Sequence, residues 1–182
     1  MKRVIFITAP EVFRDEEYYK PKKVFENAGI EVVTASTKTG ELTGRFGFKT
    51  TSDLLIDSIN ANDFDAIVYI GGGGASVFFN DPYALKLAND FFKQSKPTTA
   101  ICIASIILAN AGILKNKKAT VFVDGKEALI KNGAVYTGAD IEIDSNIITA
   151  NGHEVAEKFG KTVLKELNLN YSPQLLLRGN RA

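Results

Sequence analysis

The sequence predicts an α/β fold with a mainly parallel central sheet and helices on both of its faces. Short apolar runs rich in β-branched residues, typical of buried strands, alternate with segments whose apolar residues recur at helical spacing. This alternation favours parallel strands joined by right-handed helical crossovers. The length of 182 residues and the 45% share of hydrophobic residues are enough for a sizeable core. We therefore expect one domain over residues 1–170, followed by a tail over residues 171–182 that lacks a helical pattern.

Each expected strand is a short apolar run that ends at a glycine, a polar turn or a helix. The first is RVIFITA, and a later one, DAIVYI, runs directly into four glycines. The stretch 38–51, rich in glycine and threonine, predicts a hairpin, while residues 54–59 fit either a helical turn or a short strand. The predicted strands cover residues 3–9, 30–35, 41–43, 47–50, 65–70, 98–103, 118–123, 134–137 and 147–150.

The expected helices are marked by their ends and by their apolar spacing. Gly29 and Gly112 are suitable C-terminal stops, and Asp81 followed by Pro82 is typical of a helix N-terminus. In the last helix, apolar residues recur every four positions on one face. The predicted helices cover residues 16–28, 81–94, 104–111 and 153–167.

Composition excludes several classes of function. With 22 basic and 21 acidic residues, the net charge of +1 gives no general attraction to nucleic acid or to an anionic membrane. The single cysteine, Cys102, cannot form an internal disulfide, and one cysteine with one histidine cannot build a Cys/His zinc site. No signal peptide is visible, and the most apolar stretch, residues 100–114, is too short to span a bilayer. We therefore expect a cytoplasmic protein. No metal or cofactor is expected either.

The functional site is expected beyond the carboxyl ends of the strands, where the loops 10–19, 71–76 and 102–105 meet. In the third loop, the strand TTAIC passes into the helix IASIILANAG without a glycine, a proline or a polar turn. Cys102 is therefore predicted on an abrupt elbow like the one that presents a nucleophile in α/β-hydrolases. The dipole of the following helix is expected to lower the pKa of this thiol. The alternative is a buried structural cysteine.

Glycines and carboxylates occupy the other two loops. The run Gly71–Gly74 can expose backbone N–H groups, which beside a nucleophile would form an oxyanion hole. A tight turn and a phosphate-binding loop are the alternatives, although neither G-x-G-x-x-G nor a Walker pattern is present. The cluster of Asp15, Glu16 and Glu17 is typical of helix capping. If one of these carboxylates faces inward beside Cys102, burial would raise its pKa and allow it to move protons.

Four segments of the chain carry a specific resemblance in their order and spacing. They are FRDEEYYKPKKVFENAGIEVVTAS, DFDAIVYIGGGG, TTAICIASIILANAGILKNKKAT and IDSNIITANGHEVAEKFGKTVLKEL. From residue 1 to about residue 168, the chain resembles the ThiJ/PfpI superfamily, also called the DJ-one superfamily. The resemblance implies a flavodoxin-like three-layer α/β sandwich with a cysteine nucleophile elbow. It also implies a homodimer or a higher oligomer, the usual state of structurally known members.

The resemblance assigns roles to individual positions. Cys102 matches the family's nucleophile, and Glu17 matches the buried glutamate that hydrogen-bonds this cysteine. Gly71 and Gly72 match the glycine pair whose N–H groups face the site. The amide of Ile103, directly after the cysteine, is expected to contribute as well.

The chain also departs from the family pattern. Peptidases of the PfpI type have a histidine directly after the cysteine, where this chain has Ile103. Other members have a histidine after the next strand, where this chain has Phe122. His153 stands where the family usually has proline, at the mouth of the last helix. It is an accessory candidate together with Asn151 and Tyr18, and surface, capping or packing roles are the alternatives.

Together with these residues, the family resemblance implies an enzyme that needs neither metal nor glutathione. Through a Cys102–Glu17 pair it would act on reactive carbonyls such as methylglyoxal, as a glyoxalase or deglycase. Three alternatives stay open: a redox sensor or stress-protective chaperone with an oxidisable Cys102, a nucleotide-binding module that uses the glycine run, and a peptidase or amidohydrolase of the PfpI type. The expected partners are a small-molecule substrate and further copies of the chain, with no nucleic acid or membrane.

Overall fold

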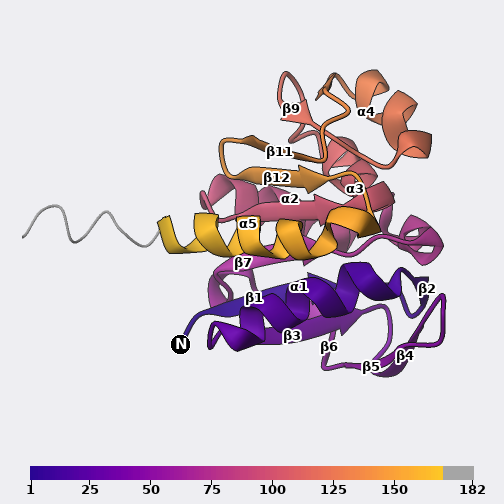
Figure 1. The fold of residues 1–182 in the computed structure, drawn as a ribbon, viewed down its shortest axis with the longest axis vertical. Coiled ribbons are helices and arrows are strands. Elements are labelled where there is room, and N and C mark those ends of the chain that lie inside the picture. The colour runs from indigo at the N-terminus through magenta and orange to yellow at the C-terminus, as the bar shows by residue number, and fades with distance from the viewer. Residues whose placement is uncertain (170–182) are drawn as a thin grey trace, which may run out of the picture.

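The computed structural model describes residues 1–169, and the predicted tail over residues 171–182 lies outside the described residues. At the centre is a seven-stranded sheet in the order β11-β12-β8-β7-β1-β3-β6 (Figure 1). Neighbouring strands are parallel except for β11 and β12, which are antiparallel. The bounds are β1 (Arg3–Ile7), β3 (Glu31–Ser36), β6 (Leu54–Leu55), β7 (Ala66–Tyr69), β8 (Thr98–Ile101), β11 (Ile141–Asp144) and β12 (Ile147–Ala150).

Helices cover both faces of this sheet, which confirms the predicted α/β fold. Because side chains alternate along a strand, Val4 and Phe6 of β1 belong to one buried cluster and Ile5 to the other. The first cluster includes residues of α1 and α5, and the second includes residues of α2 and α3. Figure 1 accordingly shows α1 and α5 side by side in front of the sheet. The bounds are α1 (Asp15–Asn27), α2 (Pro82–Lys93), α3 (Ser105–Asn110) and α5 (Ala156–Leu169).

Two smaller sheets extend this layered arrangement. One has three strands in the order β2-β4-β5, and its antiparallel β4–β5 pair confirms the hairpin predicted over residues 38–51. The other pairs β9 with β10 next to α4. The bounds are β2 (Glu11–Phe13), β4 (Gly40–Gly44), β5 (Lys49–Ser52), β9 (Lys118–Ala119), β10 (Val135–Tyr136) and α4 (Lys126–Lys131).

The main helices begin largely as their sequences indicate. The Asp81 side chain accepts a hydrogen bond of 2.8 Å from the N–H of Ala84, and Pro82 opens α2, as predicted. α5 is preceded by a 3₁₀ turn at His153–Val155, so the predicted helix at 153–167 begins with a different geometry. Among residues 1–169, no helix is long and apolar enough to cross a membrane.

The structure also corrects several predicted elements. The strand predicted over residues 118–123 is paired only over Lys118–Ala119. Residues 54–59 contain both predicted alternatives, because β6 is followed by a 3₁₀ turn at Ile56–Ser58. Three observed elements, β2, β11 and α4, are not predicted from the sequence. β2 and α4 have only 3 and 6 residues, too few to show a clear periodicity, and β11 is only partly buried.

Candidate active site

Four loops meet at the carboxyl edge of the central sheet. Ile7 of β1 pairs with Tyr69 of β7, and Tyr69 pairs with Ala100 of β8. On the far side of β8, Ile101 pairs with Ala150 of β12. The segments that follow these four strands therefore begin side by side. They carry Glu17 at the start of α1, the glycines 71–74, Cys102, and residues 151–153.

Cys102 lies at an abrupt turn from strand to helix, as predicted. β8 ends at Ile101, and Cys102 adopts a φ of +62°, which is uncommon for a residue with a side chain. This conformation explains why the strand predicted over residues 98–103 ends early. A 3₁₀ turn at Cys102–Ala104 leads directly into α3, so the helix predicted over 104–111 follows the elbow. The half-buried thiol is thereby directed out of the strand at the carboxyl edge of the sheet.

Glu17 and Cys102 approach one another across Gly71. A Cβ atom on Gly71 would lie 2.5 Å from Oε2 of Glu17 and 2.7 Å from Cβ of Cys102. No side chain fits into that space, so the glycine is what allows the two functional groups to face each other. Glu17 is fully buried, and within residues 1–169 neither of its carboxyl oxygens has a hydrogen bond of normal geometry.

This environment favours a protonated Glu17. Burial raises the pKa of the Glu17 carboxyl from 4.5 to about 8, because a carboxylate loses its hydration there. Interactions with Cys102, with the positive charge of Arg14 and with the amide of Gly71 oppose this rise in pKa without cancelling it. Glu17 can therefore both hold and release a proton near neutral pH.

The pKa of Cys102 is raised and not lowered, which corrects the prediction from the helix dipole. Burial raises the pKa of the thiol to about 12, and the negative charge of an ionised Glu17 acts in the same direction. The amides of Ile103 and Gly72 face the sulfur and lower its pKa. Their effect is smaller because a short 3₁₀ turn, followed by a helix of 6 residues, contributes little against the loss of solvent.

The first two glycines of the run serve different groups. The amide of Gly71 interacts with Glu17, whereas the amide of Gly72 interacts with Cys102. Gly72 has a φ of +94°, and a Cβ atom there would lie only 2.3 Å from the backbone nitrogen of Arg14. The loop is thus a tight turn, one of the alternatives predicted for it, and it also presents N–H groups to both titratable side chains.

The three carboxylates that open α1 have separate surroundings. Asp15 is buried and accepts hydrogen bonds from the amides of Phe46 (3.0 Å) and Phe48 (2.8 Å), which fixes the turn between β4 and β5. Glu16 is half-buried and pairs with Arg14. Glu17 alone faces Cys102, so only one residue of the cluster faces inward to the site.

Arg14 is a site residue that the sequence analysis missed. Its Nε donates to Glu16 at 2.7 Å, and its Cζ lies 4.8 Å from the ring centroid of Phe46. Its positive charge acts on both Glu17 and Cys102. The available signal was a lone basic residue directly before the acidic cluster, in the loop that follows the first strand.

Tyr18 does not line the site. It is fully buried, and its hydroxyl lies 2.7 Å from Oγ1 of Thr34 and 2.8 Å from Oγ1 of Thr50. Its ring packs on Phe6 and Phe13 in the core under α1. The accessory role suggested for Tyr18 is therefore wrong, and the packing alternative holds.

His153 and Asn151 follow β12, the strand that pairs with β8. Both line a hollow of about 310 Å³ together with Phe122 and Tyr136. The Asn151 side chain donates to the carboxylate of Asp140 at 3.3 Å. Within residues 1–169 neither of the two side chains hydrogen-bonds to Cys102 or Glu17, and the charge of His153 acts on Glu16. Residues 1–169 contain no group of three or more His, Cys, Asp or Glu side chains that could hold a metal ion.

Comparison with known proteins identifies relatives along nearly the whole described chain. Residues 2–166 match the DJ-1/PfpI family. A Bacillus subtilis protein named "Putative cysteine protease YraA" is 32% identical, over 92% of this chain and 99% of that protein. "Deglycase PH1704" of Pyrococcus horikoshii is also 32% identical, over 81% of this chain and 89% of that protein.

A solved structure shares the architecture closely. The crystal structure of a ThiJ/PfpI domain protein from Brachyspira murdochii superimposes with a TM-score of 0.90 at 31% sequence identity. The match covers 92% of this chain and 96% of that chain. The flavodoxin-like arrangement of the central sheet is therefore common to both proteins.

Proposed function

The chain belongs to the DJ-1/PfpI family, and from this premise we propose that it is a cysteine-dependent enzyme acting on reactive carbonyls, as a glyoxalase or deglycase. The substrate class is an α-oxoaldehyde such as methylglyoxal. A deglycase among its relatives supports this choice.

One observation carries the proposal: the contact of Cys102 with Glu17 across Gly71. The pair couples a nucleophile to a buried acid whose pKa is about 8, close to the value at which a group can both take and give a proton. The two groups titrate together, and the reactive form is the pair that has lost one of its two protons.

In the first step, this singly protonated pair adds to the aldehyde carbon. The sulfur of Cys102 forms a C–S bond, and the carbonyl π-electrons move to oxygen. The remaining proton passes through Glu17 to that oxygen, which gives a hemithioacetal. The amides of Gly72 and Ile103, which already face the sulfur, are placed to stabilise the negative oxygen as it develops.

In the second step, Glu17 moves a proton from the hemithioacetal carbon to the neighbouring ketone carbon. The carboxylate removes the hydrogen from the carbon bonded to sulfur and returns it to the ketone carbon, while the hydroxyl proton of the hemithioacetal passes to the ketone oxygen. The carbon bonded to sulfur becomes the carbonyl of a thioester on Cys102, and its neighbour becomes the alcohol carbon. Water then cleaves the C–S bond, releasing a hydroxy acid and restoring the thiol. One α-oxoaldehyde and one water give one hydroxy acid, so no external oxidant or reductant is consumed.

The experiment measures lactate formed from methylglyoxal by the purified protein and by the variants Cys102→Ala and Glu17→Gln. Glu26→Gln is a matched control, because Glu26 lies on the same helix but is exposed and pairs with Lys22. We expect the two site variants to lose activity and the control to keep it. Equal conversion by all four proteins would overturn the proposal.

Peptidase activity is the second candidate, favoured by the name of the Bacillus subtilis relative. The position directly after Cys102 is Ile103, and within residues 1–169 no histidine hydrogen-bonds to Cys102 or Glu17. Hydrolysis of a fluorescent casein by the same preparations separates the two functions. Hydrolysis that depends on Cys102, without lactate formation, would replace the carbonyl proposal by this one.

A further inference from the structure

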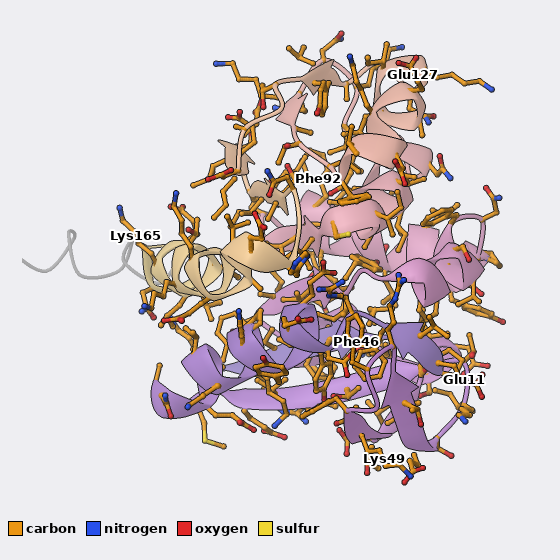
Figure 2. All side chains as sticks on the ribbon, turned by 45° about the vertical axis from the view of Figure 1, so that its right-hand side comes forward. Glu11, Phe46, Lys49, Phe92, Glu127 and Lys165 are labelled. Atoms are coloured by element: carbon orange, nitrogen blue, oxygen red, sulfur yellow. The ribbon has the colours of Figure 1, made fainter. Side chains whose placement is uncertain are left out.

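The guanidinium of Arg14, the residue before α1, is held in a fixed position by Glu16 and Phe46. Glu16 accepts hydrogen bonds from Nε at 2.7 Å and from Nη2 at 3.3 Å, so one edge of the guanidinium is occupied. Phe46, labelled in Figure 2, lies on the turn between β4 and β5, and the centroid of its ring is 4.8 Å from Cζ of Arg14. These contacts remove much of the rotational freedom of a long side chain.

The backbone of Arg14 connects both halves of the site. Its N–H donates to the carbonyl of Gly71 at 3.0 Å, and its own carbonyl accepts from the N–H of Glu17 at 3.1 Å. Arg14 therefore stands between the glycine turn and the first turn of α1. A small shift of either element would move the guanidinium with it.

The charge of Arg14 reaches the reacting groups. It lowers the pKa of Glu17, and the negative charges of Glu17 and Cys102 in turn raise the pKa of Arg14, after the larger effect of Glu16. These effects accord with the backbone bonds that join Arg14 to Gly71 and Glu17, because Gly71 lies between Glu17 and Cys102.

One edge of this guanidinium is unused. An arginine has five N–H donors, and Glu16 takes two of them. Within residues 1–169, no acceptor is bonded to Nη1 or to the second hydrogen of Nη2.

We infer that the free edge of Arg14 binds a carboxylate of the substrate, so that the site favours reactive carbonyl compounds that carry a negative charge over neutral ones. The identification of the bound carboxylate as part of a substrate rests on the proposed function. The binding of an anion by Arg14 does not depend on turnover. A planar carboxylate matches the two parallel N–H groups of a guanidinium edge. The chemical class is thus an α-oxoaldehyde that bears a carboxylate.

The test compares two alkylating reagents of nearly the same size on Cys102. Iodoacetate carries a carboxylate and iodoacetamide carries a neutral amide, so the ratio of their alkylation rates reports anion recognition beside the sulfur. We expect Arg14→Met to lower the ratio of iodoacetate to iodoacetamide by about tenfold, the factor of a weak charge-assisted hydrogen bond. Differences in intrinsic reagent reactivity cancel when the ratio is compared between variants.

Arg45→Met is the matched control, because Arg45 lies over the same Phe46 ring, at 5.8 Å. It is expected to leave the ratio unchanged. Arg14→Lys keeps the charge but loses the planar fork and is expected to give an intermediate ratio. If Arg14→Met fails to fold, Arg14→Lys and Arg14→Gln carry the same comparison. A ratio that Arg14 variants leave unchanged, or that Arg45→Met lowers equally, would overturn the inference.

Turnover separates this result from the proposed function. If methylglyoxal is converted in a Cys102-dependent reaction but the Arg14 variants leave the alkylation ratio unchanged, only the anion site is rejected. If no α-oxoaldehyde is converted but the alkylation ratio depends on Arg14, the carbonyl proposal fails and the anion site stands.

Discussion

Glu17 of α1 and Cys102 of the elbow after β8 face each other across Gly71, which has no side chain to separate them. A Cβ atom on that glycine would lie 2.5 Å from the Glu17 carboxyl and 2.7 Å from the Cys102 Cβ. The two residues are 85 positions apart in sequence, and the strand register between β1, β7 and β8 brings their loops together. The chemistry that we propose depends on this contact.

Substitution of Gly71 tests whether the close approach is required. In Gly71→Ala the new methyl group must displace Glu17 or Cys102, and we expect a loss of about 1–3 kcal/mol in the free energy of unfolding. Gly73→Ala is the control, because Gly73 is exposed and the nearest atom to its added Cβ is 3.9 Å away. Denaturant unfolding of the two variants checks this. Equal stability of the two would show that the space at Gly71 is not limiting.

The raised pKa of Glu17 predicts a pH dependence of stability. The folded protein holds the Glu17 proton more tightly than the unfolded chain does, since its pKa rises from 4.5 to about 8. The contribution of this proton to the free energy of unfolding is fully present below pH 4.5. It is lost as the pH rises to about 8. Glutamine does not titrate, so Glu17→Gln should gain stability relative to wild type across this interval. Denaturant unfolding at several pH values measures the difference, and a constant difference would mean that Glu17 titrates normally.

His153 is expected to contribute little to the chemistry. It lines a hollow with Phe122 and Tyr136 and, among the described residues, makes no hydrogen bond with Cys102 or Glu17. His153→Ala should therefore change methylglyoxal turnover far less than the roughly 10²-fold loss expected when a general acid or base is removed. Steady-state kinetics decide the matter, and a loss as large as that of Glu17→Gln would make His153 part of the mechanism.

Oxidation of Cys102 should follow the protonation of the pair. Because the Cys102–Glu17 pair holds both of its protons below about pH 8, we expect slow oxidation by mild peroxide below that pH and faster oxidation above it. Mass spectrometry of the intact protein counts the oxygens added. Rapid sulfinic acid formation at neutral pH would favour the redox-sensing alternative.

Most of the central fold is predictable from the sequence, because its strands and helices are apolar runs or amphipathic segments with a clear periodicity. Buried strands such as DAIVYI and the amphipathic α5 are recognisable from composition and spacing. β2 and α4 are not, because segments of 3 and 6 residues are too short to show a clear periodicity. The early end of β8 depends on the backbone conformation of a single residue, Cys102.

The candidate site is predicted in part. The elbow, the glycines and Glu17 follow from strand ends and from the family resemblance. The direction of the Cys102 pKa does not, because burial and the charge of Glu17 depend on tertiary packing that the helix-dipole argument leaves out. The directions of the Tyr18 and Arg14 side chains are also not predictable from their nearness to the acidic cluster in sequence. Tyr18 bonds Thr34 in the core, whereas Arg14 bonds Glu16.

The most direct test of the coupled pair is the pH profile of Cys102 alkylation by iodoacetamide in wild type and in Glu17→Gln. The account predicts that the wild-type rate rises with an inflection near pH 8, where the pair loses its first proton. Glu17→Gln should lack this inflection and follow the ionisation of the thiol alone. Glu26→Gln should match wild type. Superimposable profiles for wild type and Glu17→Gln would contradict the account, because Glu17 would then have no part in the reactivity of Cys102.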